Sequence, residues 1–137
     1  MTVKLFVPKE SASGEKRVAM APAVVDRVVR LGTELSVQAG AGAGSRIPDA
    51  AFEAKGAKIV KTKASPLKSA DVVLRVAPPT AADIKGMKAG SILASFVYTN
   101  RNPDVVKALA EAKVTTLAME LIPRITRAQA MEALSSQ

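Results

Sequence analysis

Short apolar segments alternate with amphipathic ones along almost the whole chain. Six of the apolar segments are short, rich in Val, Ile, Leu and Ala, and bounded by polar or turn-forming residues. This pattern is typical of buried β-strands. We therefore predict strands at 3–7, 35–38, 57–60, 71–76, 91–97 and 114–118.

Helices are expected between these strands. Pro22 suits the first position of a helix that Gly32 ends. The face of this helix that points to the core is formed by Val24, Val25, Val28 and Val29. Further on, a short helix is expected at 48–55 and a helical turn at 66–70.

Two capping signals mark the later helices. Thr80 and Asp83 have the spacing of a capping box, with Asp in place of the usual Glu, and predict a brief helix. Asn102 as cap and Pro103 as first residue predict another helix. Its inward face is expected to carry Val105, Val106 and Leu109.

Strands separated by helices imply βαβ crossovers, which make the strands parallel and place helices on both faces of the sheet. The sequence has no internal repeat, low-complexity tract or obvious linker. We therefore predict one α/β domain over residues 1–137, with a mainly parallel sheet of the Rossmann or flavodoxin-like type.

Composition narrows the possible chemistry. The sequence has no cysteine, which excludes a disulfide framework or a Cys-based metal site and fits a reducing compartment. It has no histidine either, which excludes a Ser-His-Asp triad, a His-based zinc site and an imidazole general base within this chain. We expect neither a metal site nor a catalytic side chain.

Twenty Lys and Arg against twelve Asp and Glu give a formal charge of +8. This fits either a well-solvated surface or an anionic partner such as a dinucleotide. Nucleic acid is disfavoured because the lysine-rich run at 54–70 has no aromatic side chain to stack on bases. The N-terminus lacks an apolar signal core, and the longest uncharged stretch, 89–100, is shorter than a membrane span. We predict a cytoplasmic protein.

Gly40, Gly42 and Gly44 form a glycine-rich segment after the second strand. A dinucleotide fingerprint needs G-x-G-x-x-G after the first strand and at the start of a helix. Here the third glycine comes one place early, and Pro48 follows rather than a helix start. The segment is therefore interpreted as a flexible connection rather than a phosphate-binding loop.

Charged residues gather in the loop after the first strand: Lys9, Glu10, Glu15, Lys16 and Arg17. In an open α/β sheet this loop lies at the carboxyl end of a strand, where ligands bind. Arg17 could hold a carboxylate or a phosphate in a bidentate fork. A solvated loop with loose ion pairs explains the same residues equally well.

The C-terminal segment is dense in polar groups. Thr126 and Gln129 fit a capping box, which accounts for both residues structurally. The box does not explain four further residues, Arg124, Arg127, Glu132 and Ser135. A helix start flanked by arginines favours an anion such as a pyrophosphate, so we predict a surface or ligand role for this segment.

Four blocks of the sequence resemble the alanine dehydrogenase/nicotinamide nucleotide transhydrogenase family. They are Val-Pro-Lys-Glu…Gly-Glu-Lys-Arg-Val-Ala…Pro over 7–22, Gln-Ala-Gly-Ala-Gly over 38–42, Asp-Val-Val-Leu-Arg-Val over 71–76, and Met-Glu-Leu-Ile-Pro-Arg-Ile-Thr-Arg-Ala-Gln over 119–129. The last block, continued to Gln137, is the most specific and resembles the alpha subunit of proton-translocating NAD(P) transhydrogenase. In that family a Rossmann NAD domain follows and a returning C-terminal segment completes the first domain. The resemblance implies that both lie outside this chain.

The resemblance also separates the two branches of the family. Alanine dehydrogenases have a substrate-binding lysine where this chain has Ala77, and a catalytic histidine where it has Tyr98. Alanine oxidation is therefore disfavoured. A transhydrogenase needs no such acid/base pair, because hydride passes directly between two nicotinamides that must be oriented closely.

In the transhydrogenase pattern, four positions hold the nicotinamide end of NAD(H), and they correspond to Arg124, Gln129, Glu132 and Ser135. The family usually has Asp where this chain has Glu132. Arg17 matches a retained family arginine whose role without a keto acid is open.

The resemblance implies an oxidoreductase in which this chain supplies part of the NAD(H) site. NADP(H)-binding and membrane components would be its partners, and a homodimer is expected for the complete subunit. Alone, the chain is expected to be inactive and to bind NAD weakly or not at all. The alternatives are a stand-alone binding module, an alanine dehydrogenase domain, and a basic nucleic-acid binder.

Overall fold

The computed structural model describes residues 2–121. Strands and helices alternate along it, as the apolar segments predicted. In chain order they are β1 (Lys4–Val7), α1 (Pro22–Arg30), β2 (Glu34–Gln38), η1 (Ala43–Ser45), α2 (Asp49–Ala54), β3 (Lys58–Val60), α3 (Ala64–Ser69), β4 (Val72–Leu74), α4 (Ala81–Gly86), β5 (Ile92–Ser95), α5 (Pro103–Glu111), β6 (Thr115–Ala118) and η2 (Met119–Leu121).

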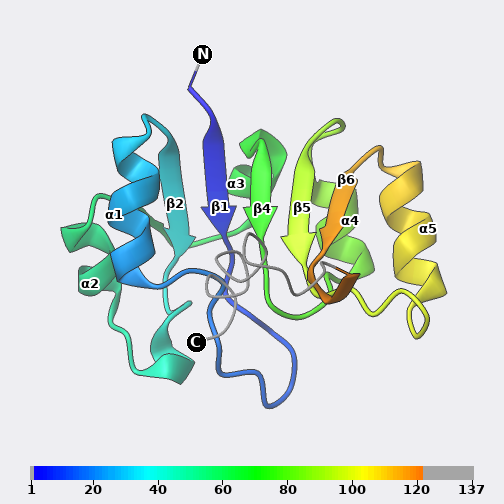
Figure 1. The fold of residues 1–137 in the computed structure, drawn as a ribbon, viewed down its shortest axis with the longest axis horizontal. Coiled ribbons are helices and arrows are strands. Elements are labelled where there is room, and N and C mark those ends of the chain that lie inside the picture. The colour runs from blue at the N-terminus through cyan, green and yellow to red at the C-terminus, as the bar shows by residue number, and fades with distance from the viewer. Residues whose placement is uncertain (1, 122–137) are drawn as a thin grey trace.

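The six strands form one sheet in the order β3-β2-β1-β4-β5-β6 (Figure 1). Every neighbouring pair is parallel. All the carboxyl ends of the strands therefore lie at one edge of the sheet. The strand order reverses between β1 and β4, because β2 and β3 extend to one side of β1 and β5 and β6 to the other.

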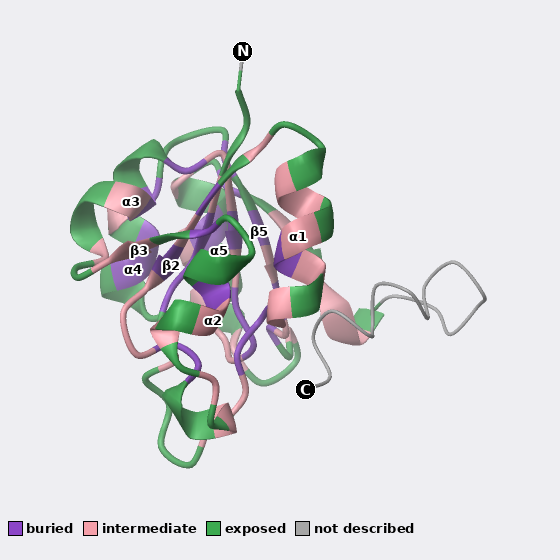
Figure 2. Ribbon diagram, turned by 90° about the vertical axis from the view of Figure 1, so that its left-hand side faces the viewer, coloured by how far each residue is buried: buried purple, intermediate pink, exposed green. Residues whose placement is uncertain are grey.

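Two apolar cores lie on opposite faces of the sheet. One contains Val25 of α1 and Phe52 of α2, packed with Val7 and Val37. The other brings together the buried residues of α3, α4 and α5, with Phe6 and Leu93 from the strands. Figure 1 shows α1 in front of the sheet and α3 and α4 behind it, and Figure 2 shows the buried residues concentrated between these layers. The predicted α/β fold is confirmed, with a sheet that is wholly parallel.

Two strands end earlier than the sequence predicted. The regular strand β4 ends at Leu74 and β5 at Ser95, whereas apolar residues continue to Val76 and Val97, and the Phe96 N–H still donates to the Val76 carbonyl. Both of these valines are fully buried. The loops that leave the sheet are themselves packed into the core, so apolar character continues after strand pairing has ended.

The later helices confirm one cap and correct another. The Thr80 hydroxyl accepts a hydrogen bond from the Asp83 N–H and caps α4, as predicted. Asn102 precedes α5, but its side chain donates to the carbonyls of Val97 and Tyr98 instead of capping the helix. Val106 was expected to face inward and is instead 39% exposed. α5 lies at the margin of the sheet, so only part of its apolar face finds a partner in the described chain.

Part of the sheet has an apolar face without a helix on it in residues 2–121. Figure 1 shows β4, β5 and β6 uncovered on the side of α1. Ile92 and Leu117 belong to these strands and are 37% and 45% exposed. Among the residues described here, no helix has both the length and the apolar character needed to cross a membrane.

Candidate functional site

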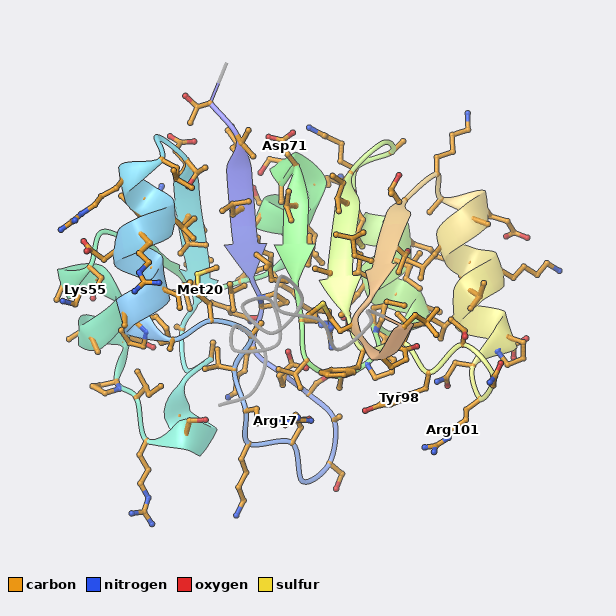
Figure 3. All side chains as sticks on the ribbon, in the orientation of Figure 1. Arg17, Met20, Lys55, Asp71, Tyr98 and Arg101 are labelled. Atoms are coloured by element: carbon orange, nitrogen blue, oxygen red, sulfur yellow. The ribbon has the colours of Figure 1, made fainter. Side chains whose placement is uncertain are left out.

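The point where the strand order reverses defines the candidate site. In open parallel α/β sheets, the loops that leave β1 and β4 in opposite directions open a crevice at the carboxyl ends, and ligands bind there. We call this region the carboxyl edge. It consists of the loops that follow the strands, residues 8–21, 39–48, 75–80 and 96–102, together with η2. Arg17, Tyr98 and Arg101 all lie at this edge in Figure 3, whereas Asp71 lies at the opposite one.

Glu10 ties the loop after β1 to the end of β4. Its two carboxylate oxygens accept hydrogen bonds from the Val76 N–H at 2.9 Å and the Ala77 N–H at 3.0 Å. The Glu10 side chain is only 3% exposed, and its Oε1 lies 3.8 Å from the Arg75 guanidinium. A carboxylate that receives backbone N–H bonds out of contact with water is strongly held. Glu10 therefore fixes the spacing of the two loops that form the crevice.

Arg75 is a buried arginine beneath this crevice, and no sequence motif indicated its role. Its guanidinium donates to Asp83 at 2.9 Å and to the carbonyl of Ala77 at 3.2 Å. Lys63 contacts the other oxygen of Asp83 at 2.8 Å. Burial opposes ionisation of Asp83, but the hydrogen bond from Lys63 and the charge of Arg75 outweigh it and lower its pKa. The loop after β4 and the start of α4 are thereby locked together.

Arg17 forms an ion pair within its own loop. Its Nε and Nη2 atoms donate to the two oxygens of Glu15, each at 3.0 Å. This hydrogen bonding lowers the pKa of Glu15 and raises that of Arg17. The bidentate fork thus already holds a carboxylate of its own loop. The Arg17 side chain nevertheless stays 41% exposed, and its guanidinium lies 6.0 Å from the ring centre of Phe96.

An aromatic pair continues this row of side chains. The rings of Phe96 and Tyr98 are stacked, with centres 5.9 Å apart and an angle of 16° between their planes. The Arg101 guanidinium lies over the Tyr98 ring at 5.4 Å. Tyr98 is 37% exposed. The edge therefore presents two stacked rings, with the Arg17 guanidinium beside Phe96 and the Arg101 guanidinium beside Tyr98, an arrangement that suits a planar, negatively charged ligand.

Glu120 is a second carboxylate that binds backbone N–H groups. From η2, its two oxygens accept hydrogen bonds from Val97 at 2.9 Å and from Thr99 at 3.3 Å. Burial opposes its ionisation, but the backbone N–H groups around it prevail and lower its pKa. The loop after β5 is thus bound to the end of β6. Glu10 and Glu120 both lie in the blocks that resemble the family, but the sequence assigned neither of them this role, although each acid comes within three residues of the end of a strand.

The glycine-rich segment packs against protein rather than opening to a ligand. A Cβ at Gly42 would lie 2.6 Å from the carbonyl oxygen of Ile47, and one at Gly44 would lie 2.8 Å from the backbone of Lys16. These glycines allow the loop after β2 to approach its neighbours closely. This geometry agrees with a structural connection and offers no open pocket for a phosphate.

The four predicted NAD(H)-binding residues, Arg124, Gln129, Glu132 and Ser135, lie outside the described residues. So do Thr126, which with Gln129 forms the predicted capping box, and Arg127, which the box does not explain. β6 and η2 carry the chain to the carboxyl edge just before this segment begins. The two positions that disfavour alanine oxidation are described: Ala77 and Tyr98 both lie at the carboxyl edge, and the Ser95 hydroxyl donates to the carbonyl of Ala77 at 3.1 Å.

A hollow of about 380 Å³ lies away from the carboxyl edge, toward the amino ends of β1, β2 and β3 on the α3 side. Lys4, Glu34 and Lys58 contribute to its walls. Its position at the starts of the strands is where parallel sheets seldom bind ligands, so we place the site at the carboxyl edge instead. Residues 2–121 contain no group of three or more acidic side chains placed to share a metal ion.

Known proteins with similar sequences include transhydrogenase subunits and alanine dehydrogenases. Over 98% of its length the chain is 45% identical to an NAD(P) transhydrogenase alpha-subunit protein of Rhodospirillum rubrum, and covers 36% of that protein. It is 39% identical to NAD(P) transhydrogenase subunit alpha of Haemophilus influenzae, over 95% of the chain and 25% of that protein. It is 37% identical to alanine dehydrogenase of Mycobacterium tuberculosis, over 88% of the chain and 32% of that protein.

The fold has solved relatives as well. A transhydrogenase from Sinorhizobium meliloti superposes with a TM-score of 0.88 at 43% identity, over 96% of this chain and 39% of that one. The chain thus spans between a quarter and two fifths of the length of these relatives. The family model described as "Alanine dehydrogenase/PNT, N-terminal domain" matches residues 6–137. The chain therefore belongs to the alanine dehydrogenase/PNT N-terminal domain family.

Proposed function

We propose that this chain is the first domain of the NAD(H)-binding component of a proton-translocating NAD(P) transhydrogenase. In the complete enzyme, hydride would pass between NAD(H), held partly by this domain, and NADP(H) on another component. The observation that carries the proposal is 45% identity over 98% of the chain to a transhydrogenase alpha subunit. The reversal of strand order at β1 and β4 supports it, since it provides a crevice of the dinucleotide-binding type.

The residues at the carboxyl edge fit one part of a dinucleotide better than the other. The stacked rings of Phe96 and Tyr98, with Arg17 beside the first and Arg101 beside the second, suit a planar ring with a charged group near it. By contrast, Gly42 and Gly44 are packed against protein backbone, so this segment is not an open glycine loop for the pyrophosphate. We infer that most of the NAD affinity resides in a Rossmann domain beyond this chain, and that the isolated chain binds NAD weakly or not at all.

Within this proposal, Arg124, Gln129, Glu132 and Ser135 hold the nicotinamide end of NAD(H). Hydride transfer between two nicotinamides needs close approach and orientation rather than a proton donor. The chain's lack of histidine is therefore compatible with it. The partners are an NADP(H)-binding component and a membrane component, the complete subunit is a homodimer, and the domain sits on the cytoplasmic side of the inner membrane.

The alanine dehydrogenase alternative rests on the 37% identity to the Mycobacterium tuberculosis enzyme. It is disfavoured by Ala77 and Tyr98, which occupy the positions of the substrate lysine and the catalytic histidine in that branch. Pyruvate- and ammonia-dependent oxidation of NADH by the longest protein that the source gene encodes would favour this alternative over transhydrogenation.

Calorimetric titration of the 137-residue chain with NADH tests whether this chain alone supplies little of the NAD affinity. We expect no saturable heat at micromolar concentrations. The companion experiment mixes the longest protein encoded by the gene with an NADP(H)-binding component, and follows NADH-dependent reduction of an NADP analogue. Activity there, with Arg124→Ala lowering it and the exposed Arg27→Ala leaving it unchanged, supports the proposal. Tight NADH binding by the isolated chain, or no transfer in the mixture, contradicts it.

A further inference from the structure

Tyr98 has an unusual backbone conformation for its residue type. Its φ is +52°, in the left-handed region that glycine and asparagine occupy readily and that bulky residues seldom adopt. Such a conformation is strained for a residue that has a side chain, and it persists only where the surroundings impose it. The residues around Tyr98 must therefore supply interactions that hold this conformation.

Some of the interactions that hold Tyr98 in this conformation are hydrogen bonds within its own loop. The Tyr98 carbonyl accepts from the N–H groups of Arg101 at 2.8 Å and Asn102 at 3.1 Å. The Asn102 side chain also donates to the Val97 carbonyl at 2.8 Å. These bonds lie within the loop itself and form a turn. They do not attach the loop to the rest of the domain.

Glu120 is the side chain from another element that binds this loop. Its two oxygens accept from Val97 and Thr99, the residues on either side of Tyr98. One carboxylate thus binds the peptide between Phe96 and Val97 and the peptide between Tyr98 and Thr99, while the Asn102 side chain binds the Val97 carbonyl between them. Hydrogen bonds to an ionised acceptor are stronger than those between neutral groups, and a chelating pair also fixes orientation. The Glu120 carboxylate therefore restrains the backbone conformation of Tyr98 through its neighbours in the chain.

The position of the ring follows from that restraint. Since a side chain leaves the backbone in a direction set by φ and ψ, the left-handed conformation decides where the Tyr98 ring points. Here it lies on Phe96, which in turn lies beside Arg17. A change of Tyr98 to an ordinary extended or helical conformation would redirect the ring and break the stack.

We propose that Glu120 is a positioning residue: by accepting the N–H groups on both sides of Tyr98, it holds that residue in the left-handed conformation and keeps its ring as an aromatic wall of the carboxyl edge. The ligand class that this wall takes is the planar ring of a dinucleotide, and in that respect the inference rests on the proposed function. Glu120 touches no ligand in this role and acts only through Tyr98.

The sequence provides a direct reporter, because Tyr98 is the only tyrosine and there is no tryptophan. Tyrosine fluorescence and the tyrosine ring signals in NMR spectra therefore come from this one residue. The variant is Glu120→Gln, which keeps the shape of the side chain but replaces one acceptor oxygen with an NH₂ donor. The matched control is Glu111→Gln, the same change at an exposed glutamate at the end of α5.

In Glu120→Gln we expect the nuclear Overhauser contacts between the Tyr98 and Phe96 rings to be lost and acrylamide quenching of Tyr98 to rise. Amide exchange at Val97 and Thr99 should accelerate by about tenfold or more. Glu111→Gln should leave all three measurements unchanged. A folded Glu120→Gln chain with intact ring contacts and unchanged quenching overturns the inference.

A second variant covers the case in which Glu120→Gln does not fold. Glycine adopts the left-handed region without strain, so in Tyr98→Gly the loop can keep its conformation without the hydrogen bonds from Glu120. The double variant Tyr98→Gly/Glu120→Gln should then recover the folded state. Failure of the double variant to fold shows that Glu120 has a general structural role, and this also overturns the inference.

These measurements need no nucleotide, so they separate the inference from the proposed function. In the longest protein that the source gene encodes, Glu120→Gln should raise the KM for NADH about tenfold with a smaller change in kcat, because a wall that orients the ligand has moved. If that protein transfers no hydride at all, the proposed function fails while the result on Tyr98 stands. If it transfers hydride and Tyr98 is unmoved in the variant, only the inference fails.

Discussion

The two edges of the parallel sheet contain similar charged side chains but use them differently. At the amino edge, Asp71 accepts the Lys4 N–H and pairs with Lys88; the side chains of Asp71 and Lys88 are 37% and 44% exposed. At the carboxyl edge, the side chains of Glu10, Arg75 and Asp83 are each only 3% exposed. Ion pairs in water contribute little, whereas buried and fully bonded charges are costly to break. The carboxyl edge therefore has fixed loops, and the amino edge has only a charged surface.

The hollows at the two edges differ in the same way. The larger one, at the amino edge, is lined by residues such as Lys4, Ser36 and Lys58. The carboxyl edge has a smaller hollow of about 180 Å³ beside Tyr98, Arg101 and Glu120. The Glu120 carboxylate is bound to backbone N–H groups of the loop that forms its wall.

The largest expected effect belongs to Glu10. Replacing it with alanine removes both acceptors for the Val76 and Ala77 N–H groups and one anion near the buried Arg75. We expect Glu10→Ala to lower the free energy of unfolding by about 3 kcal/mol in urea denaturation. Glu53→Ala, at an exposed position of α2, should change it by no more than about 0.5 kcal/mol. Equal effects of the two variants would remove the contrast between the edges.

A smaller, pH-dependent effect belongs to Lys63, which pairs with Asp83. Because the pKa of Asp83 is lowered in the folded state, the pair stabilises the fold above the ordinary aspartate value near pH 4. This stability is lost as the pH falls from there through the lowered value. Lys63 is 41% exposed and partly screened, so Lys63→Met should cost about 1 kcal/mol at pH 7.

The check on Lys63 is the urea midpoint measured across pH 2 to 7. The difference between wild type and Lys63→Met should shrink as Asp83 takes up a proton below about pH 4. Lys61→Met, at an exposed lysine near β3, serves as the control and should show no such trend. A difference that stays constant with pH would mean that the pair is not the source of the effect.

The smallest effect is expected at the amino edge. Lys88→Met removes the partner of Asp71, but both side chains are largely in water. We expect the thermal midpoint at pH 7 to change by no more than the error of the measurement. A loss of stability as large as that expected for Lys63→Met would show that the amino edge is held together in the same way as the carboxyl edge.

Much of the fold could be predicted from the sequence because the spacing of apolar residues and the residues that cap or end each element are local properties. The valine face of α1, the cap formed by Thr80, and the six strands were all visible as patterns. Errors occurred where the chain stays buried beyond the end of a regular strand, as at Val76 and Val97. They also occurred where a side chain donates to the carbonyls of its own loop instead of capping the helix, as at Asn102. Val106 was misassigned because a periodic face does not state how much of it a neighbour covers.

The candidate site was less predictable. The resemblance directed attention to Arg124, Gln129, Glu132 and Ser135, whose roles remain predictions. Arg17 was recognised as a loop arginine, but its partner Glu15 could not be chosen over a ligand from the sequence. Arg75 and Glu120 were given no role, and Glu10 was noted only as one charge of the loop after the first strand, because the fold rather than a local pattern decides which groups these side chains bind. Glu10 and Val76, for example, are 66 positions apart.

The sequence by itself determined which segments are strands and helices, that the strands run parallel, and that imidazole and thiol chemistry are excluded, because these follow from local pattern and composition. Only the tertiary structure decided which loops meet at the carboxyl edge, which carboxylates bind backbone N–H groups there, and why Tyr98 adopts a left-handed conformation. Those features depend on contacts between residues distant in sequence, and such contacts exist only once the sheet has brought the ends of β1, β4, β5 and β6 together.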